Sequence, residues 1–382
     1  MKVKGLLERL DGGEVLLGDG GYLIELEKRG YVMAGPWTPE VVLENPDAVE
    51  QLHKEFIRSG SDIIQSFTFY ASEDKLNTIE SDIVKQFGVS ELNRRACRIA
   101  KDVAKERGTL VAAGITQTPS YREGRGKEVV QEEFQKQIDV FVEEGVDFII
   151  AEQFYYAEEM EWAMEVVSRY DLPTCCTMSL TRNGDSSNHS VEECALRMAR
   201  SGADVIGINC ALGPFESLQI MERIKRALHE AGIQRHLMIQ PLGIHTPEAQ
   251  SLNNGWIDLP EQPLALEPRQ CTRWDFMKFA RTAYSMGVRY IGGCCWTQGY
   301  HIRAMAEELK DERNRLPIAS SKHGGLDLNV FDSVRERSGV NYWKNMIPRS
   351  GRSTSSTGHC LNCINSKIAF SNNDQSEMSL QI

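Results

Sequence analysis

The sequence predicts a (β/α)8 barrel with a C-terminal arm. Eight short segments contain nearly continuous apolar runs, as strands buried on both faces do. A stretch with helical periodicity follows each of them, and this alternation is typical of a parallel sheet. Eight such units in about 310 residues fit a closed barrel better than an open doubly wound sheet, which stays the alternative because a sequence does not give strand order. The predicted strands are residues 14–21, 62–69, 109–115, 147–154, 173–180, 204–210, 236–243 and 290–295.

The helices between these strands have recognisable ends. In residues 45–60, Asn45 can cap the helix, Pro46 suits its first turn and Gly60 stops it. Apolar residues at helical spacing share one face of this segment. Elsewhere a glycine closes a helix just before the next strand, as in "EEGVDF", "RSGADVI" and "SMGVRYI". These signals place a helix between each pair of consecutive strands.

The regular alternation is interrupted once and then ends. Residues 245–272 form a long insertion before a helix predicted at about 273–287. We expect the barrel to span residues 1–317 and residues 318–349 to form a docked arm, because only a few apolar anchors remain there. Residues 350–382 are rich in Ser and Asn and poorly periodic, which indicates a disordered polar tail.

The composition is that of an ordinary globular protein, with 41% hydrophobic and 25% charged residues. A net charge of −11 argues against nucleic acid or an anionic membrane as a partner. The longest apolar runs have the length of strands and the first residues lack an apolar signal core, so we expect neither a membrane span nor secretion. Ten cysteines in 382 residues are too few for a disulfide scaffold, and we expect them to be reduced, in the cytoplasm.

Polar side chains gather at the carboxyl ends of the predicted strands, where a (β/α)8 barrel carries its chemistry. Asp19 follows the first strand and Glu152 belongs to the end of the fourth. Cys210 ends the sixth strand and Cys294 and Cys295 end the eighth, so three thiols are expected at one mouth. Three cysteine ligands with a fourth position left open describe a catalytic zinc site.

The adjacent cysteines require a special backbone, because successive residues of a strand point to opposite faces. A bulge or turn at Gly292-Gly293 would bring both sulfurs inward. The alternative is that these cysteines are small buried hydrophobes, as most free cysteines are. The similar pair Cys175-Cys176 lies within an apolar run, and we interpret that pair in this second way.

Several motifs spread along the chain belong together as one pattern: "GDGG", "TFYASEDKL", "GINC", "RYIGGCC", "EKRGYVMAGPWTPE", "QTPSY" and "GYHIRA". In these motifs, from about residue 5 to 348, the chain resembles the zinc-dependent homocysteine S-methyltransferase family, and above all its betaine-using members. The resemblance implies one Zn2+ per chain on Cys210, Cys294 and Cys295. It also implies methyl transfer from glycine betaine to homocysteine, giving dimethylglycine and methionine, by a homo-oligomer (dimer or tetramer) assembled partly through the C-terminal arm.

Carboxylates and glycines at the mouth suit the acceptor of such a reaction. Asp19 and Glu152 can bind its α-ammonium group, and the amides of Gly20 and Gly21 can approach its carboxylate. The alternative is that each carboxylate forms a salt bridge with a neighbouring Arg or Lys. A carboxylate next to a tricysteinate zinc would be repelled, which favours a cationic ligand group between them.

Aromatic residues near the first two strands suit the donor. A quaternary ammonium cannot form hydrogen bonds, so its site recognises it by cation–π contact and by shape. The candidates are Trp37, Phe69 and Tyr70, of which Trp37 and Tyr70 match the donor-side positions of the family. Ordinary packing is the alternative for all three.

Three positions depart from the family pattern. Gln153 stands where the family has a donor-site tyrosine, Trp296 where a glycine usually follows the cysteine pair, and Asn329 where a histidine is common. These changes concern the methyl donor, so S-methylmethionine or another sulfonium compound is the alternative to betaine. A third hypothesis is a non-catalytic barrel with a structural or redox-sensing cysteine cluster. A structural zinc site would need a fourth protein ligand and no substrate-binding carboxylates, which favours the enzyme.

Overall fold

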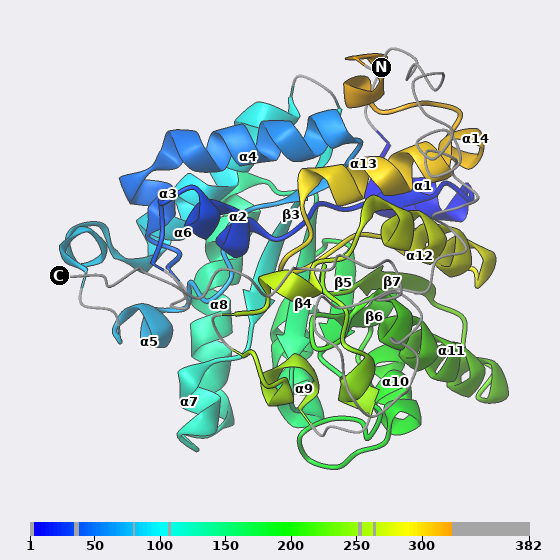
Figure 1. The fold of residues 1–382 in the computed structure, drawn as a ribbon. Coiled ribbons are helices and arrows are strands. Elements are labelled where there is room, and N and C mark those ends of the chain that lie inside the picture. The colour runs from blue at the N-terminus through cyan, green and yellow to red at the C-terminus, as the bar shows by residue number, and fades with distance from the viewer. Residues whose placement is uncertain are drawn as a thin grey trace, which may run out of the picture.

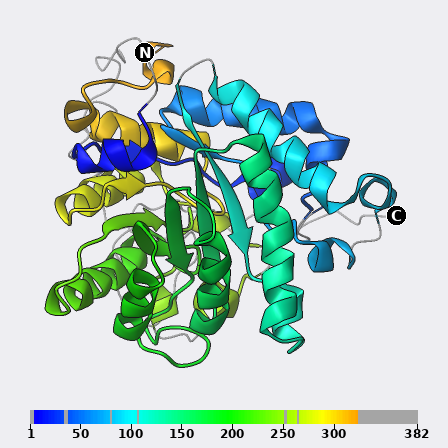
Figure 2. The ribbon, with the colours of Figure 1, turned by 180° about the vertical axis from the view of Figure 1, so that it is seen from behind.

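Eight parallel strands form the centre of the computed structural model, and helices surround them (Figure 1 and, from behind, Figure 2). The strands are β1 (Leu16–Leu17), β2 (Ile63–Gln65), β3 (Leu110–Thr116), β4 (Phe148–Phe154), β5 (Thr174–Met178), β6 (Val205–Asn209), β7 (His236–Gln240) and β8 (Tyr290–Ile291). The structure describes residues 4–33, 38–78, 81–105, 108–250, 254–262 and 265–322.

The strand order shows a nearly closed (β/α)8 TIM barrel. The order is β1-β8-β7-β6-β5-β4-β3-β2, and β1 pairs in parallel with β8. Between β1 and β2, Asp62 bridges the seam: its N–H donates to the Leu17 carbonyl at 2.7 Å, and its carboxylate accepts the Leu17 N–H at 2.9 Å. The predicted barrel is confirmed, and the open doubly wound sheet is wrong because the first and last strands are neighbours.

The helices follow the strands as expected. Within the described residues the α-helices are α1 (Leu6–Asp11), α2 (Tyr22–Lys28), α3 (Val41–Glu44), α4 (Pro46–Ser59), α5 (Glu73–Leu76), α6 (Asp82–Ala104), α7 (Pro119–Arg122), α8 (Lys127–Glu144), α9 (Ala157–Val167), α10 (Val191–Arg200), α11 (Pro214–Glu230), α12 (Arg273–Ser285), α13 (Gly299–Glu308) and α14 (Lys310–Arg313). The 3-10 helices are η1 (Pro247–Gln250), η2 (Gly255–Asp258), η3 (Glu267–Arg269) and η4 (Ile318–Lys322).

The ends of α4 show which local signals act in the folded chain. Gly60 stops the helix with a φ of 119°, a left-handed conformation that favours glycine. Pro46 occupies the first turn, as predicted. Asn45 stands at the N-cap, but its side chain forms no capping hydrogen bond. The expected capping hydrogen bond from the Asn45 side chain is therefore wrong, although the helix begins where the sequence indicates.

The core has an inner and an outer layer. Inside the barrel, Leu6 and Leu10 of α1 join residues from all eight strands, so α1 closes the amino-terminal end of the barrel. The outer layer packs the other faces of the strands against the helices. Cys175 belongs to the inner layer and Cys176 to the outer one, and both are fully buried. This confirms the interpretation of that pair as packing residues.

The predicted insertion at 245–272 contains the three short turns η1, η2 and η3 ahead of α12. The proposed arm lies beyond the described residues from position 323 onward, and so does the whole predicted tail at 350–382. None of the helices in the described part of the chain combines the length and apolarity needed to cross a bilayer.

Candidate active site

Three cysteine sulfurs meet at the carboxyl end of the barrel. Cys210 follows β6, Cys294 and Cys295 follow β8, and the three Sγ atoms lie within 4.8 Å of one another. Cys210 and Cys295 are buried, and Cys294 is partly exposed. Hydrogen bonds from the Cys210 and Cys294 thiols lower the pKa of Cys295 well below its ordinary value. The cluster thus stabilises a thiolate, the form that binds metals.

A four-residue turn allows the adjacent cysteines to share one cluster. The N–H of Thr297 donates to the Cys294 carbonyl at 3.0 Å, and Trp296, the third residue of the turn, has a φ of 61°. A positive φ at this position is the mark of a type II turn, where glycine is the usual residue. The turn expected at Gly292-Gly293 therefore lies three residues further on, and it explains why a glycine would ordinarily follow the cysteine pair.

Backbone strain concentrates around the sulfur cluster. Seven non-glycine residues in the described part of the chain have a positive φ, and two of them are asparagines, which tolerate it. The other five lie at, or within a few residues of, the carboxyl ends of β2, β4, β6 and β8: Tyr70, Gln153, Cys210, Ala211 and Trp296. Strain of this kind persists where the surroundings enforce it and gathers at functional sites, so it singles out this mouth.

Two buried carboxylates share a cavity with the cysteine pair. Asp19 is 3% exposed and Glu152 is 6% exposed. Burial raises the pKa of Asp19 to about 7 and that of Glu152 to about 8. A cationic group placed between them would offset this cost of burying negative charge.

The partners of these carboxylates are neutral donors. Asp19 Oδ2 accepts from the Gln65 N–H at 2.6 Å and from the Tyr22 hydroxyl at 2.8 Å. Glu152 Oε2 accepts from Asn209 Nδ2 at 3.0 Å, and its other oxygen accepts from the Gln65 amide. Within the described residues neither carboxylate pairs with an Arg or Lys, so the salt-bridge alternative finds no support there.

Sequence reasoning missed the residues behind Asp19. The Tyr22 hydroxyl also contacts His53 Nδ1 at 2.7 Å, and both residues are buried. Burial lowers the pKa of His53 to about 3, so the imidazole is neutral. The Tyr22 hydroxyl donates its hydrogen bond to Asp19, so the Tyr22 oxygen accepts one from His53 Nδ1–H. This chain of hydrogen bonds holds the Asp19 carboxylate in place. The only sequence signal was the position of Tyr22, three residues after Asp19.

Most of the predicted substrate residues line one cavity. Phe69 belongs to it, and Tyr70 packs edge-on against Phe69 with ring centroids 4.7 Å apart, while Trp37 lies outside the described residues. Gly20 and Gly21 press against the turn of the cysteine pair: a Cβ on Gly20 would lie 2.3 Å from the Thr297 carbonyl oxygen. The Gly21 N–H already donates to that oxygen at 2.9 Å. The cavity lining comprises Asp19, Gly20, Gly21, Tyr22, Leu23, Gln65, Ser66, Phe67, Phe69, Glu152, Gln240, Gly293, Cys294 and Cys295.

A second cluster of possible metal ligands, His245, Cys271 and Asp275, lies elsewhere in the fold. Asp275 caps α12 by accepting from the Thr272 N–H and hydroxyl, and it pairs with His245 Nε2 at 3.2 Å. These bonds already satisfy the carboxylate. The cluster therefore has a structural explanation.

Comparison with known proteins agrees with this geometry. The model of the family described as homocysteine S-methyltransferase matches residues 16–309. The chain belongs to the homocysteine S-methyltransferase family. A solved structure, the metallated homocysteine methyltransferase of Escherichia coli, has a TM-score of 0.61 at 18% identity, covering 78% of this chain and 96% of that one. At that identity the likeness shows a shared fold.

Two similar family members are named for different methyl donors. The chain is 50% identical over 353 residues to betaine–homocysteine S-methyltransferase 1 of Bos taurus, covering 91% of this chain and 86% of that protein. It is 48% identical to the S-methylmethionine–homocysteine S-methyltransferase of Pongo abelii, covering 91% and 94%. Nearly equal identities do not choose between the donors, so the residues of the site have to be considered.

Of the three positions that depart from the family pattern, Gln153 and Trp296 lie next to site residues, and Asn329 lies outside the described residues. The Gln153 side chain donates to the Tyr155 hydroxyl at 3.3 Å, and Tyr155 lines a second cavity together with Arg122. Trp296 is 6% exposed and packs edge-on against Trp256, with ring centroids 5.5 Å apart. Trp256 belongs to η2, so the long insertion covers the strand-eight side of the cluster.

Proposed function

We propose that the protein is a zinc-dependent enzyme that moves a methyl group from glycine betaine to homocysteine. The observation that carries the proposal is the meeting of three cysteine sulfurs within 4.8 Å of one another, where Cys294 and Cys295 line a cavity with two buried carboxylates. Zinc–sulfur bonds are about 2.3 Å long, so sulfurs on one tetrahedral zinc lie about 4 Å apart, a spacing that thiols already within 4.8 Å of one another reach by small side-chain rotations. Cys210, Cys294 and Cys295 therefore fit one Zn2+ per chain with a position open for substrate.

The chemistry divides between the metal and the side chains around it. Bound zinc would keep the homocysteine sulfur as a thiolate, the nucleophilic form of a thiol. Glu152 and Asp19 would hold the α-ammonium group. The sulfur then attacks a methyl carbon of betaine, the new S–C bond forms as the C–N bond breaks, and the electron pair leaves with nitrogen as dimethylglycine. Positioning of the two substrates in line supplies much of the rate.

Aromatic and basic groups around the second cavity support betaine as the donor. Tyr155 offers an aromatic face to this cavity two residues from Gln153. On the β2 side, Phe69 lines the cavity of the cysteine pair and Tyr70 packs against Phe69. Arg122 lines the same cavity as Tyr155 and suits a carboxylate. Betaine carries both an onium group and a carboxylate, and so does S-methylmethionine, which remains the second candidate because a named relative uses it.

A donor panel tests this proposal directly. Zinc-loaded protein with homocysteine would be offered betaine, S-methylmethionine and a sulfonium betaine, and methionine formation would be followed. We expect betaine to give the highest kcat/KM. A preference for S-methylmethionine would replace the donor and keep the acceptor, whereas no methionine from any donor would favour a non-catalytic barrel.

Trp296→Gly should weaken the donor selectively if Trp296 replaces the aromatic wall that is missing at Gln153. Loss of a desolvated cation–π contact should raise the donor KM by the equivalent of about 0.5–2 kcal/mol. Homocysteine binding and zinc content should be unchanged, and adding Gln153→Tyr should recover part of the loss. Steady-state kinetics in both substrates measures these effects.

Trp256→Leu is the matched control for that experiment, because it disturbs the same aromatic pair from the insertion side. If Trp296 only packs against Trp256, both variants should lower the melting temperature alike while the donor KM stays constant. That result would remove Trp296 from the donor site.

The remaining expectations belong to the same proposal. We place the enzyme in methionine biosynthesis in the cytoplasm, as a homo-oligomer, dimer or tetramer, assembled partly through an arm at residues 318–349. Sedimentation of the full chain beside a variant truncated after residue 322 would test the role of the arm.

A further inference from the structure

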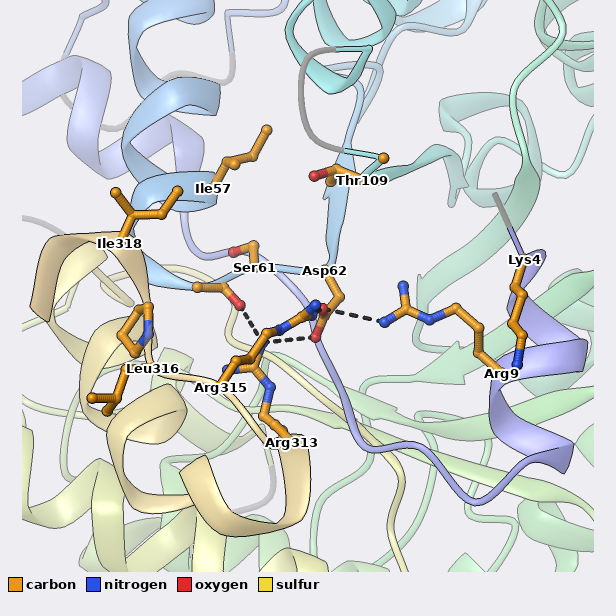
Figure 3. Close-up of a pocket in the computed structure, with 13 residues that line it drawn as sticks. Lys4, Arg9, Ile57, Ser61, Asp62, Thr109, Arg313, Arg315, Leu316 and Ile318 are labelled. Carbon is orange, nitrogen blue, oxygen red and sulfur yellow. Dashed lines mark hydrogen bonds and ion pairs between the residues drawn. The ribbon is translucent and has the colours of Figure 1, made fainter. Parts of the chain in front are cut away.

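A basic cavity, separate from the two cavities described above, opens at the amino-terminal end of the barrel, opposite the candidate active site. Its wall includes Asp62, which directly precedes β2, and Thr109, which directly precedes β3, as well as residues that follow α13. Figure 3 shows Arg9, Arg313 and Arg315 directed toward Asp62, with Lys4 near Arg9. This region takes no part in the proposed methyl transfer.

Positive charge in this cavity exceeds the negative charge that the described residues supply. Asp62 Oδ2 accepts from Arg313 Nη2 at 2.9 Å, and Oδ1 accepts from Arg9 Nη2 at 3.3 Å and also pairs with Arg315. Three guanidinium groups thus share one carboxylate. Glu14 pairs with Arg9 at 2.9 Å, but within the described part of the chain Arg315 shares Asp62 and Lys4 has no carboxylate partner, so both add positive charge.

Arg313 is the clearest sign of a missing ligand. Its side chain is only 2% exposed, and Nη2 donates to Asp62 and to the Gly60 carbonyl at 2.6 Å. The Nε and Nη1 atoms are buried and have no hydrogen-bond partner among the described residues. Burial and the nearby Arg9 lower the pKa of Arg313 to about 10, so the folded chain pays in free energy to keep this charge. An unsatisfied buried donor, particularly a charged one, is costly and calls for an acceptor.

We propose that this cavity binds a phosphoryl group, as inorganic phosphate or as the head of a phosphate monoester. Guanidinium groups match the oxygen geometry of phosphate, and a dianion would balance the excess of two positive charges better than a single carboxylate. Arg313 and Arg315 hold the anion, and Lys4 contributes a further donor. An apolar rim at Ile57, Leu316 and Ile318 leaves room for the organic part of an ester.

Calorimetric titration of the zinc-loaded full chain tests the proposal. Inorganic phosphate, glycerol phosphate and acetate would each be titrated at constant ionic strength made up with potassium chloride. We expect saturable binding of phosphate or the ester and none of acetate. Tighter binding of glycerol phosphate than of phosphate would identify an ester as the ligand, and the reverse would identify the free ion. No saturable heat, or equal binding of acetate, would overturn the proposal.

Variants locate the binding. Arg315→Gln should weaken phosphate binding by about tenfold or more, the effect of losing a charge-assisted hydrogen bond. Arg315 is half exposed, so this variant should fold even if Arg313→Gln does not. Arg98→Gln, an exposed arginine paired with Glu144, is the matched control and should bind phosphate normally. Glu152→Gln should also bind normally, which separates this cavity from the active site. Unchanged binding in Arg315→Gln would refute the site.

Discussion

Alanine at Cys210, Cys294 or Cys295 should abolish methionine formation and strip the protein of its zinc. The three sulfurs lie within 4.8 Å of one another, and the described residues offer no fourth protein ligand in the cluster. Two remaining thiolates would bind zinc far more weakly, because an open catalytic site already works with three protein ligands. Metal content by mass spectrometry, together with the assay of methionine, should show a fall from about one zinc per chain to a small fraction.

The matched control is Cys176→Ala, which removes a buried cysteine from the outer core and leaves the mouth intact. This variant should keep its zinc and most of its activity and should lose only some stability. Full zinc retention in all three ligand variants would remove the metal site from the mechanism. Loss of zinc in Cys176→Ala as well would mean that the measurement reports folding rather than ligation.

Glu152→Ala should weaken homocysteine binding by about 1.5–3 kcal/mol, the scale of a hydrogen bond to a charged group. Glu152 is buried, lines the cavity of the cysteine pair and is oriented by Asn209 and Gln65. Removal of its charge leaves the substrate ammonium with Asp19 alone. Homocysteine affinity, measured by calorimetry on zinc-loaded protein, should fall while zinc content stays normal.

Glu159→Ala controls for the loss of a buried carboxylate as such. Glu159 is fully buried and accepts hydrogen bonds from Thr118, and it is not among the residues of the cavity. It should change stability without changing the affinity for homocysteine. Unchanged affinity in Glu152→Ala would show that the ammonium binds elsewhere.

The fold could be predicted largely because the barrel repeats one simple pattern. Each buried strand is an apolar run, and some helices end on a glycine, so Gly60 could be assigned as a helix end from the sequence. The carboxyl ends of parallel strands meet at one mouth, and this rule alone brought Asp19, Glu152 and the three cysteines together. The ends of β1 and β8 were less predictable, since only two residues of each form ladder hydrogen bonds.

Other features depend on contacts that no local pattern encodes. His53 lies on a buried helix face, where a histidine gives no sign of contact with Tyr22. Trp296 has a left-handed backbone, which residues other than glycine rarely adopt. The turn between β8 and α13 imposes this conformation, and no local sequence pattern indicates it. Arg313 and Arg315 reach Asp62 only because the end of the barrel folds back beside β2.

Closure of the ring has a consequence for how the enzyme matures. Cys210 follows β6, the cysteine pair follows β8, and β8 is held on one side by β1, the first strand to leave the ribosome. A growing chain therefore has no complete thiol cluster until its last strand has been made and has met its first. Metal uptake, which stabilises only the chain that offers all ligands, would come after ring closure. Zinc would then distinguish finished chains from truncated or misassembled ones.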